Sequence, residues 1–204
     1  MKTVISIILI IFFNSGSLFG QELTGDQIIN KVNDLMNQET IYTKSKMTIV
    51  TTSGKTRPLE SESWSKNKGE KNLIRYLAPR RIKGQATLML NHADDIWAYF
   101  PRTKRVRKLA THAKKQKMQG SDFSYEDMGS GDIFIKDFTA SLIKNEKIKG
   151  KDCYKLELIR KKKSDVSYSR LLMWVTNENF VPIVIDYYNE WNISSMRLLL
   201  KITL

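Results

Sequence analysis

The spacing of apolar residues along the chain changes near residue 40. Before this point five apolar residues recur three and four positions apart, which predicts an amphipathic helix over residues 24–38: Ile28, Ile29, Val32, Leu35 and Met36. Thr24 and Gln27 have the spacing of a capping box at its start, and Asn37 suits its end. The apolar face of this helix needs a partner, which we expect to be a sheet.

From Ile41 onward apolar and polar residues alternate, which is the period of a half-buried strand. Besides a strand that holds Leu59 and Trp64, strands are predicted over residues 41–50, 72–77, 86–90, 96–100, 154–158, 169–176, 181–188 and 194–204. Turns rich in Gly, Asn and Pro separate them, and a short helix is predicted over residues 133–143. Successive strands without helices between them form an antiparallel meander, so we expect a mainly β fold.

The first twenty residues have the pattern of a secretory signal peptide. Lys2 precedes a mostly apolar run from Val4 to Phe13, and small and polar residues follow up to Gly20. This run is about half the roughly 20 residues that a membrane-spanning helix needs. We therefore predict cleavage near Gly20 and export of residues 21–204 to the periplasm as a single domain.

Charge and cysteine content narrow the classes of function. A formal net charge of +13 indicates a polyanionic partner, which for an exported protein is a lipid or membrane surface rather than nucleic acid. Cys153 is the single cysteine, so no intrachain disulfide can form, and its strand-like context predicts a small buried hydrophobe. His92 and His112 lack metal-ligand spacing, and no nucleophile with a matching base is evident. We therefore predict a protein without catalysis, metal or cofactor.

The stretch from Gly84 to Met128 concentrates the remaining chemistry. Two predicted strands carry Trp97 and Tyr99, and a run from Pro101 to Lys117 is basic without any acidic residue. Docking to anionic headgroups or to an acidic face of a transporter is predicted for Arg102, Lys104, Arg105, Arg107 and Lys108. A solvated loop is the plain alternative. Ser124 and Asp127 have capping-box spacing, which predicts a turn into a short helix.

Four segments resemble the outer-membrane lipoprotein-sorting family, the LolA-like group and its treponemal-type subgroup. They are residues 97–101 with 105–107, then 120–128, 150–158, and 173–175 leading to 179–182. The resemblance implies an incomplete antiparallel β-barrel around an apolar cavity, with an N-terminal helix and short lid or plug helices. It also implies that the protein shields acyl chains of lipoproteins or lipids in the periplasm, beside an inner-membrane efflux-type transporter. Family members usually extend further, so we expect an abridged or C-terminally truncated version.

Eight residues are candidates to line the implied cavity, with ordinary core packing as the alternative for each: Trp64, Tyr76, Leu88, Leu90, Trp97, Tyr99, Leu156 and Trp174. The leading hypothesis is a monomeric periplasmic carrier of lipid or lipidated cargo. The alternative is an accessory or adaptor protein of an envelope efflux-type transporter, with the sheet as its docking surface. A third hypothesis, an enzyme acting on lipids, lacks a catalytic set in the sequence.

Overall fold

The structure is a computed structural model that describes residues 22–50, 53–121, 123–129, 133–164, 166, 168–191 and 194–203. The predicted signal peptide lies outside these residues. No helix within the described ranges is long and apolar enough to cross a membrane.

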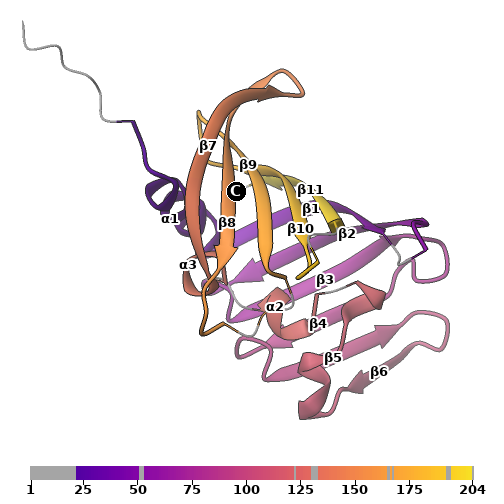
Figure 1. Ribbon diagram of the computed structural model, residues 1–204. Helices are drawn as coiled ribbons and strands as arrows, with labels where there is room; N and C mark the ends of the chain where they lie inside the picture. Colours follow the sequence, from indigo (N-terminus) through magenta and orange to yellow (C-terminus); the bar gives the residue numbers. More distant parts are fainter. Residues whose placement is uncertain are drawn as a thin grey trace, which may run out of the picture.

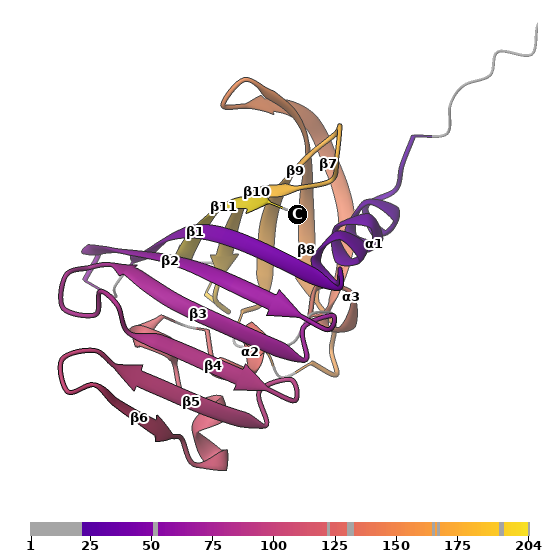
Figure 2. The same cartoon turned by 180° about the vertical axis from the view of Figure 1, so that it is seen from behind.

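One antiparallel sheet of eleven strands dominates the described part of the chain (Figures 1 and 2). The first six strands are β1 (Thr40–Val50), β2 (Thr56–Lys66), β3 (Lys71–Ala78), β4 (Ala86–Leu90), β5 (Asp95–Phe100) and β6 (Arg105–Lys108). The last five are β7 (Phe138–Ile148), β8 (Lys151–Arg160), β9 (Arg170–Thr176), β10 (Pro182–Tyr188) and β11 (Ser194–Thr203). Each set is a meander, which confirms the expected mainly β fold.

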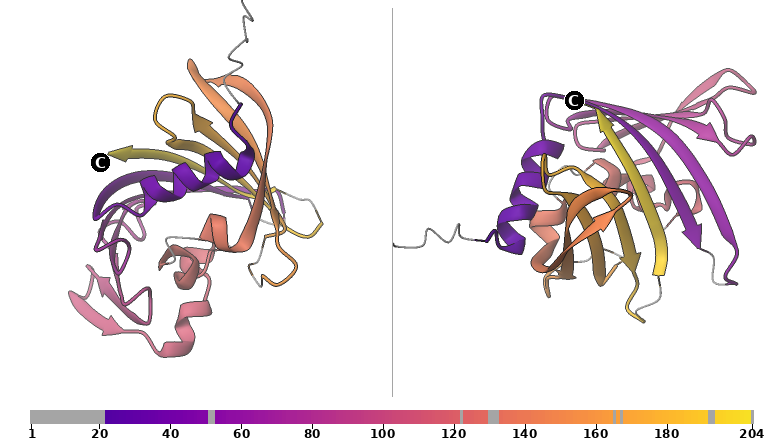
Figure 3. Two further views of the ribbon diagram at one scale, coloured as in Figure 1. Left: turned by 90° about the vertical axis from the view of Figure 1, so that its left-hand side faces the viewer. Right: turned by 90° about the horizontal axis from the view of Figure 1, so that it is seen from above.

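The two meanders meet where β1 pairs with β11, so the last strand lies in the middle of the sheet. Strands β6 and β7 form its two edges, and the curled sheet is not closed between them (Figure 3). A sheet that curls without closing leaves a concave face that other segments must cover. This arrangement confirms the incomplete antiparallel barrel.

Helix α1 (Gly25–Met36) begins with the predicted capping box. The backbone N–H of Gln27 donates to Thr24 Oγ1 at 3.2 Å, and the backbone N–H of Thr24 donates to Gln27 Oε1 at 2.9 Å. The helix buries its apolar face, and its first turn contacts β7, where Asp26 accepts a hydrogen bond from the backbone N–H of Ala140 at 3.0 Å (Figure 3). A Cβ at Gly25 would lie 2.6 Å from the β7 backbone, so this close approach requires glycine.

Two local predictions are corrected by strand pairing. The helix predicted over residues 133–143 is only α3 (Ile133–Asp137), because the chain from Phe138 onward pairs with β8 as strand β7. Part of the basic stretch, for which no strand was predicted and a solvated loop was the alternative to docking, forms β6 against β5. In both places backbone pairing with a neighbouring strand overrides a mixed local pattern, because strand preference depends on context.

The main core lies between the concave face of the sheet, α1 and the segment that joins β6 to β7. It includes Ile28 of α1, Met47 of β1 and Leu158 of β8, all at most 4% exposed. Cys153 is fully buried in a second, smaller cluster with Trp174 and Val184, which confirms its prediction as a buried hydrophobe. Burial raises the pKa of its thiol, so it stays protonated at neutral pH.

Candidate functional site

A cavity of about 170 Å³ lies on the concave side of the sheet. Strands β1, β2 and β3 form one wall, with apolar side chains such as Ile41, Leu59 and Ile74. The opposite side is formed by β10 and β11 and by the segment between β6 and β7. Residues 109–121, 123–129 and 133–137, which we call the lid, contain η1 (Thr111–Lys115), η2 (Met118–Gly120), α2 (Tyr125–Gly129) and α3.

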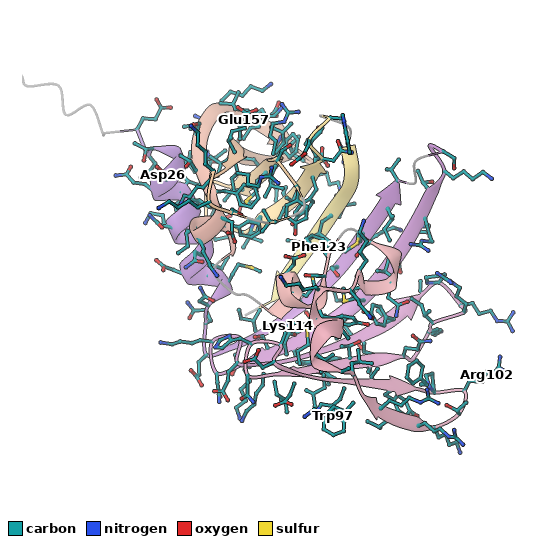
Figure 4. All side chains as sticks on the ribbon, turned by 60° about the horizontal axis from the view of Figure 1, so that its bottom comes forward. Asp26, Trp97, Arg102, Lys114, Phe123 and Glu157 are labelled. Carbon is teal, nitrogen blue, oxygen red and sulfur yellow. The ribbon has the colours of Figure 1, made fainter. Side chains whose placement is uncertain are left out.

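The lid inserts apolar side chains into the space that the sheet leaves open. Met118 is 2% exposed and Phe123 is 5% exposed, and both line the cavity. The Phe123 ring packs edge-on against Tyr187 and Tyr168, with centroid distances of 4.8 and 5.7 Å. Figure 4 shows Phe123 toward the middle of the molecule, between the two arms of the sheet. The lid therefore acts as the plug that the family resemblance implies.

A few polar contacts hold the lid to the sheet. Arg57 of β2 donates from Nη2 to the backbone carbonyls of Gln119 and Gly120, at 2.9 Å each. The side-chain amide of Asn72 donates to the carbonyl of Met128 at 3.1 Å. These hydrogen bonds hold the lid by its backbone, in addition to the packing of Met118 and Phe123 in the main core.

Helix α2 starts with a second capping box, as predicted. The backbone N–H of Ser124 donates to Asp127 Oδ2 at 2.8 Å, and the backbone N–H of Asp127 donates to Ser124 Oγ at 3.1 Å. Asp127 also lines the cavity and is the one charged residue among the described lining residues. Its carboxylate and, more strongly, burial raise the pKa of Tyr187, so that phenol stays neutral.

Tyr76 is the candidate from the sequence that lines the cavity, and it is 1% exposed. Burial raises the pKa of its phenol well above the ordinary range, with a smaller contribution from Tyr125. Leu156 is fully buried in the main core and is not among the lining residues. Trp174 lies in the second cluster, where its indole N–H donates to Glu146 at 2.7 Å and Lys155 lies 4.8 Å from its ring.

The remaining candidates occupy the outer face of the sheet. In β4 and β5 the buried, inward positions are taken by Thr87, Met89, Ile96 and Ala98, so Leu88, Leu90, Trp97 and Tyr99 point outward. Trp64 also lies outside the cavity, where its ring packs against Tyr42 and Arg75. A shift of one residue inverts the faces of a strand, and both faces here carry apolar side chains. The sequence alone therefore does not tell which set faces the cavity.

Glu62 stabilises this outer surface beside Trp64. Its carboxylate accepts hydrogen bonds from Arg75 Nε at 2.6 Å and from the Tyr42 hydroxyl at 3.0 Å. Burial opposes the charged form, but these two bonds and the nearby Arg75 and Lys44 charges together hold the Glu62 pKa below its usual range. The outer face thus has its own polar network, separate from the cavity.

Sequence reasoning missed two groups of cavity residues. One is the lid side chains Met118 and Phe123, which belong to a segment with no regular period. The other is a set of hydroxyl side chains on β1 and β2: Thr43, Ser45, Ser61, Ser63 and Ser65. The alternation of serine at positions 61, 63 and 65 was the available indication, because alternate residues of a strand share one face.

The five residues predicted to dock lie together at the hairpin of β5 and β6. The β6 residues are all exposed, and so are Arg102 and Lys104 in the turn; Figure 4 places Arg102 at the periphery. Lys108 pairs with Asp95 and lies 5.5 Å from the Trp97 ring. Among the described residues no ion pair engages Arg102, Lys104, Arg105 or Arg107. The described part of the chain contains no group of His, Cys, Asp and Glu that could hold a metal.

Comparison with known proteins identifies the family. A family model described as that of an uncharacterized protein matches residues 68–197, more than half of the chain. Comparison with curated proteins gives no match.

Three solved structures show what this fold is similar to. A domain from Vibrio parahaemolyticus named for outer membrane lipoprotein sorting is 20% identical, with a TM-score of 0.56 over 88% of this chain and 90% of that one. A DUF1329 family protein from Desulfovibrio piger is 22% identical, with a TM-score of 0.56 over 88% and 90%. A LolA superfamily protein from Nitrosomonas europaea is 19% identical, with a TM-score of 0.49 over 89% and 92%. Because the family model matches more than half of its length, the chain belongs to that family of uncharacterized proteins, and it shares the fold of the first two structures.

Proposed function

We propose that this protein is an envelope carrier that shields the acyl chains of lipoproteins or lipids in its cavity during transport. The observation that carries the proposal is an apolar cavity on the concave face of an open sheet, covered by a lid that inserts Met118 and Phe123 into it. Each CH₂ group of an acyl chain gains about 0.8 kcal/mol on leaving water. A carrier therefore needs apolar volume and an opening, and it needs no catalytic group.

The volume of the cavity bears on how cargo enters. About 170 Å³ is close to the roughly 150 Å³ of an engineered apolar cavity that accommodates benzene. A long acyl chain needs more room than a benzene ring. We infer that Met118 and Phe123 fill this room in the closed form and that the lid leaves with them when cargo enters. Release of the bonds from Arg57 to the lid carbonyls is then part of opening.

The proposal is tested by asking whether the protein carries lipid when purified. The full chain, expressed with its own leader and purified as the cell processes it, should show near-stoichiometric bound lipid by native mass spectrometry and lipid extraction. A lipid-free mass, with no uptake when acylated ligands are offered, would contradict the carrier and favour the adaptor of an envelope transporter.

We further propose that the hairpin of β5 and β6 docks to an anionic membrane surface. On its outer face Lys108 lies opposite Trp97, and Val106, which is 61% exposed, lies opposite Tyr99. Arg105 and Arg107 lie on the other face of the hairpin, and Arg102 and Lys104 are exposed in its turn. Aromatic rings with Lys and Arg are the combination that membrane interfaces favour. A carrier that docks by this edge would bring its cavity to the surface from which it collects or delivers cargo.

Reversing the charge of Arg105, Arg107 and Lys108 to Glu should weaken binding to vesicles that contain phosphatidylglycerol. Each cation near an anionic surface contributes about 1 kcal/mol, so the triple reversal should lower vesicle affinity by about a hundredfold or more. Vesicle co-sedimentation is the measurement, with circular dichroism to verify the fold. The matched control reverses Lys147, Lys149 and Lys151, exposed at the hairpin of β7 and β8. Equal losses in both variants would show a response to net charge and contradict docking by the β5–β6 hairpin.

A further inference from the structure

One wall of the cavity carries hydroxyl groups instead of hydrocarbon. The antiparallel register of β1 and β2 places Thr43 opposite Ser63 and Ser45 opposite Ser61, with Ser65 one step further along the same face. Ser45 Oγ and Ser61 Oγ lie 2.8 Å apart and form a hydrogen bond. We call these five residues, Thr43, Ser45, Ser61, Ser63 and Ser65, the hydroxyl wall.

A cavity that held only a hydrocarbon chain would gain nothing from this wall. A hydroxyl that loses water against an alkyl group, without another partner, costs free energy. Within the described part of the chain, no side-chain hydrogen bond engages the hydroxyls of Ser63 or Ser65. These groups are therefore available to a polar part of the cargo.

Asn72 extends the wall onto β3, because the sheet register places it opposite Ser65. Its amide nitrogen donates to the carbonyl of Met128, which identifies the other amide atom as the oxygen. That oxygen, Oδ1, is buried and has no hydrogen-bond partner among the residues that the structure describes. A ligand that brings an N–H or O–H group to this buried acceptor would supply the missing hydrogen bond, so such a ligand is favoured.

The charges around the cavity disfavour an anion in the same place. Among the described lining residues no Lys or Arg is present, and the single charged group is the carboxylate of Asp127. A carboxylate or phosphate drawn into this space would lose water without gaining a cation, beside an existing negative charge. The cations of the protein lie elsewhere, most densely at the hairpin of β5 and β6.

We infer that the buried part of the cargo is an acyl chain joined to an uncharged linkage, and that the hydroxyl wall and Asn72 bind this linkage. The linkage donates hydrogen bonds, so it is an amide or a group that bears a hydroxyl. The inference rests on the proposed carrier function and adds a selection among acylated molecules. Two sources share this chemistry: the N-acylated end of a lipopeptide and an acylglycerol.

Three ligands with the same sixteen-carbon chain test the selection: N-palmitoyl ethanolamine, methyl palmitate and palmitate. Delipidated full chain should bind the ethanolamide about tenfold more tightly than the methyl ester, because each neutral hydrogen bond changes affinity by a few-fold to tenfold. Palmitate should bind most weakly at neutral pH. Palmitate binding as tight as that of the ethanolamide would overturn the inference. Failure of all three ligands to bind would instead contradict the carrier function.

The triple variant Ser61→Ala, Ser63→Ala and Ser65→Ala isolates the wall. It should lose about tenfold in affinity for the ethanolamide and keep its affinity for the methyl ester within about twofold. The control variant, Thr139→Ala with Ser141→Ala, removes exposed hydroxyls of β7 and should change neither affinity. If the triple variant retains its preference for the ethanolamide while folded by circular dichroism, the wall does not bind the linkage.

A second pair of ligands distinguishes the two sources of the linkage, a lipopeptide end and an acylglycerol. A dipalmitoylated cysteinyl peptide and dipalmitoylglycerol are each offered with phosphatidylglycerol as competitor. Preference for the peptide identifies a lipopeptide end as the cargo, and preference for dipalmitoylglycerol identifies an acylglycerol; both support a neutral donor linkage. Displacement of both ligands by equimolar phosphatidylglycerol would overturn the inference of a neutral donor linkage.

Discussion

Replacing Ser63 with Phe should remove nearly all bound lipid from the purified protein. Ser63 lies on the cavity wall, and its side chain faces the same space as Thr43 and Ile74. A phenyl ring there occupies much of a cavity of about 170 Å³. Forcing extra volume into filled space costs about 1–3 kcal/mol, which corresponds to a roughly ten- to hundredfold loss of acyl-chain affinity. Native mass spectrometry and lipid extraction measure the occupancy.

The matched control is Lys66→Phe, at an exposed position of the same strand β2. It adds the same ring without entering the cavity, so bound lipid should remain at the level of the unmodified protein. Thermal unfolding of both variants verifies that they fold. A folded Ser63→Phe variant with unchanged lipid content would show that cargo binds outside this cavity.

Replacing Arg197 with Ala should cause a large loss of stability. Arg197 of β11 donates to both oxygens of Asp186 of β10, at 2.6 Å each, and the Asp186 side chain is only 3% exposed. Removing the guanidinium leaves a buried carboxylate without its partner. Breaking a fully buried ion pair lowers the free energy of unfolding by about 3–5 kcal/mol. Because the Arg197 side chain is 57% exposed, we expect a loss of roughly 2–4 kcal/mol here. Denaturant unfolding measures the loss.

A pair on the surface provides the contrast. Lys46 and Glu60 lie 3.0 Å apart with side chains 55% and 41% exposed, so Lys46→Ala should cost less than about 1 kcal/mol. The double variant Arg197→Met with Asp186→Leu should recover much of the lost stability, because no charge is then left buried. Equal costs for Arg197→Ala and Lys46→Ala would contradict the importance of the buried carboxylate.

Local patterns of the sequence predicted the elements of the fold well. The capping boxes at Thr24 and Ser124 formed because their hydrogen bonds join residues three positions apart. The alternation in β1 placed Ile41, Met47 and Ile49 on the buried face for a similarly local reason. The helix predicted beyond Asp137 failed because β8 supplies backbone partners that no local pattern reveals.

The candidate site was predicted less completely. Tyr76 was identified as a lining residue, whereas Leu88, Trp97 and Tyr99 lie on the outer face. Each of these strands has an apolar side chain on both faces, so alternation alone did not distinguish the cavity from the outside. The lid residues Met118 and Phe123 carry no periodic pattern, and only their position over the concave sheet makes them part of the site.

By itself the sequence determined the helix, the turns, most of the strands and the basic character of the stretch after Phe100, because these depend on neighbouring residues and on the composition of the chain. The tertiary structure decided how the two meanders join through β1 and β11, which face of the sheet is concave and what covers it. It also decided that Ser63 and Ser65 look into the same space as Asn72 and Asp127. Contacts of this kind arise from strand register and curvature across distant parts of the chain, which a local pattern does not encode.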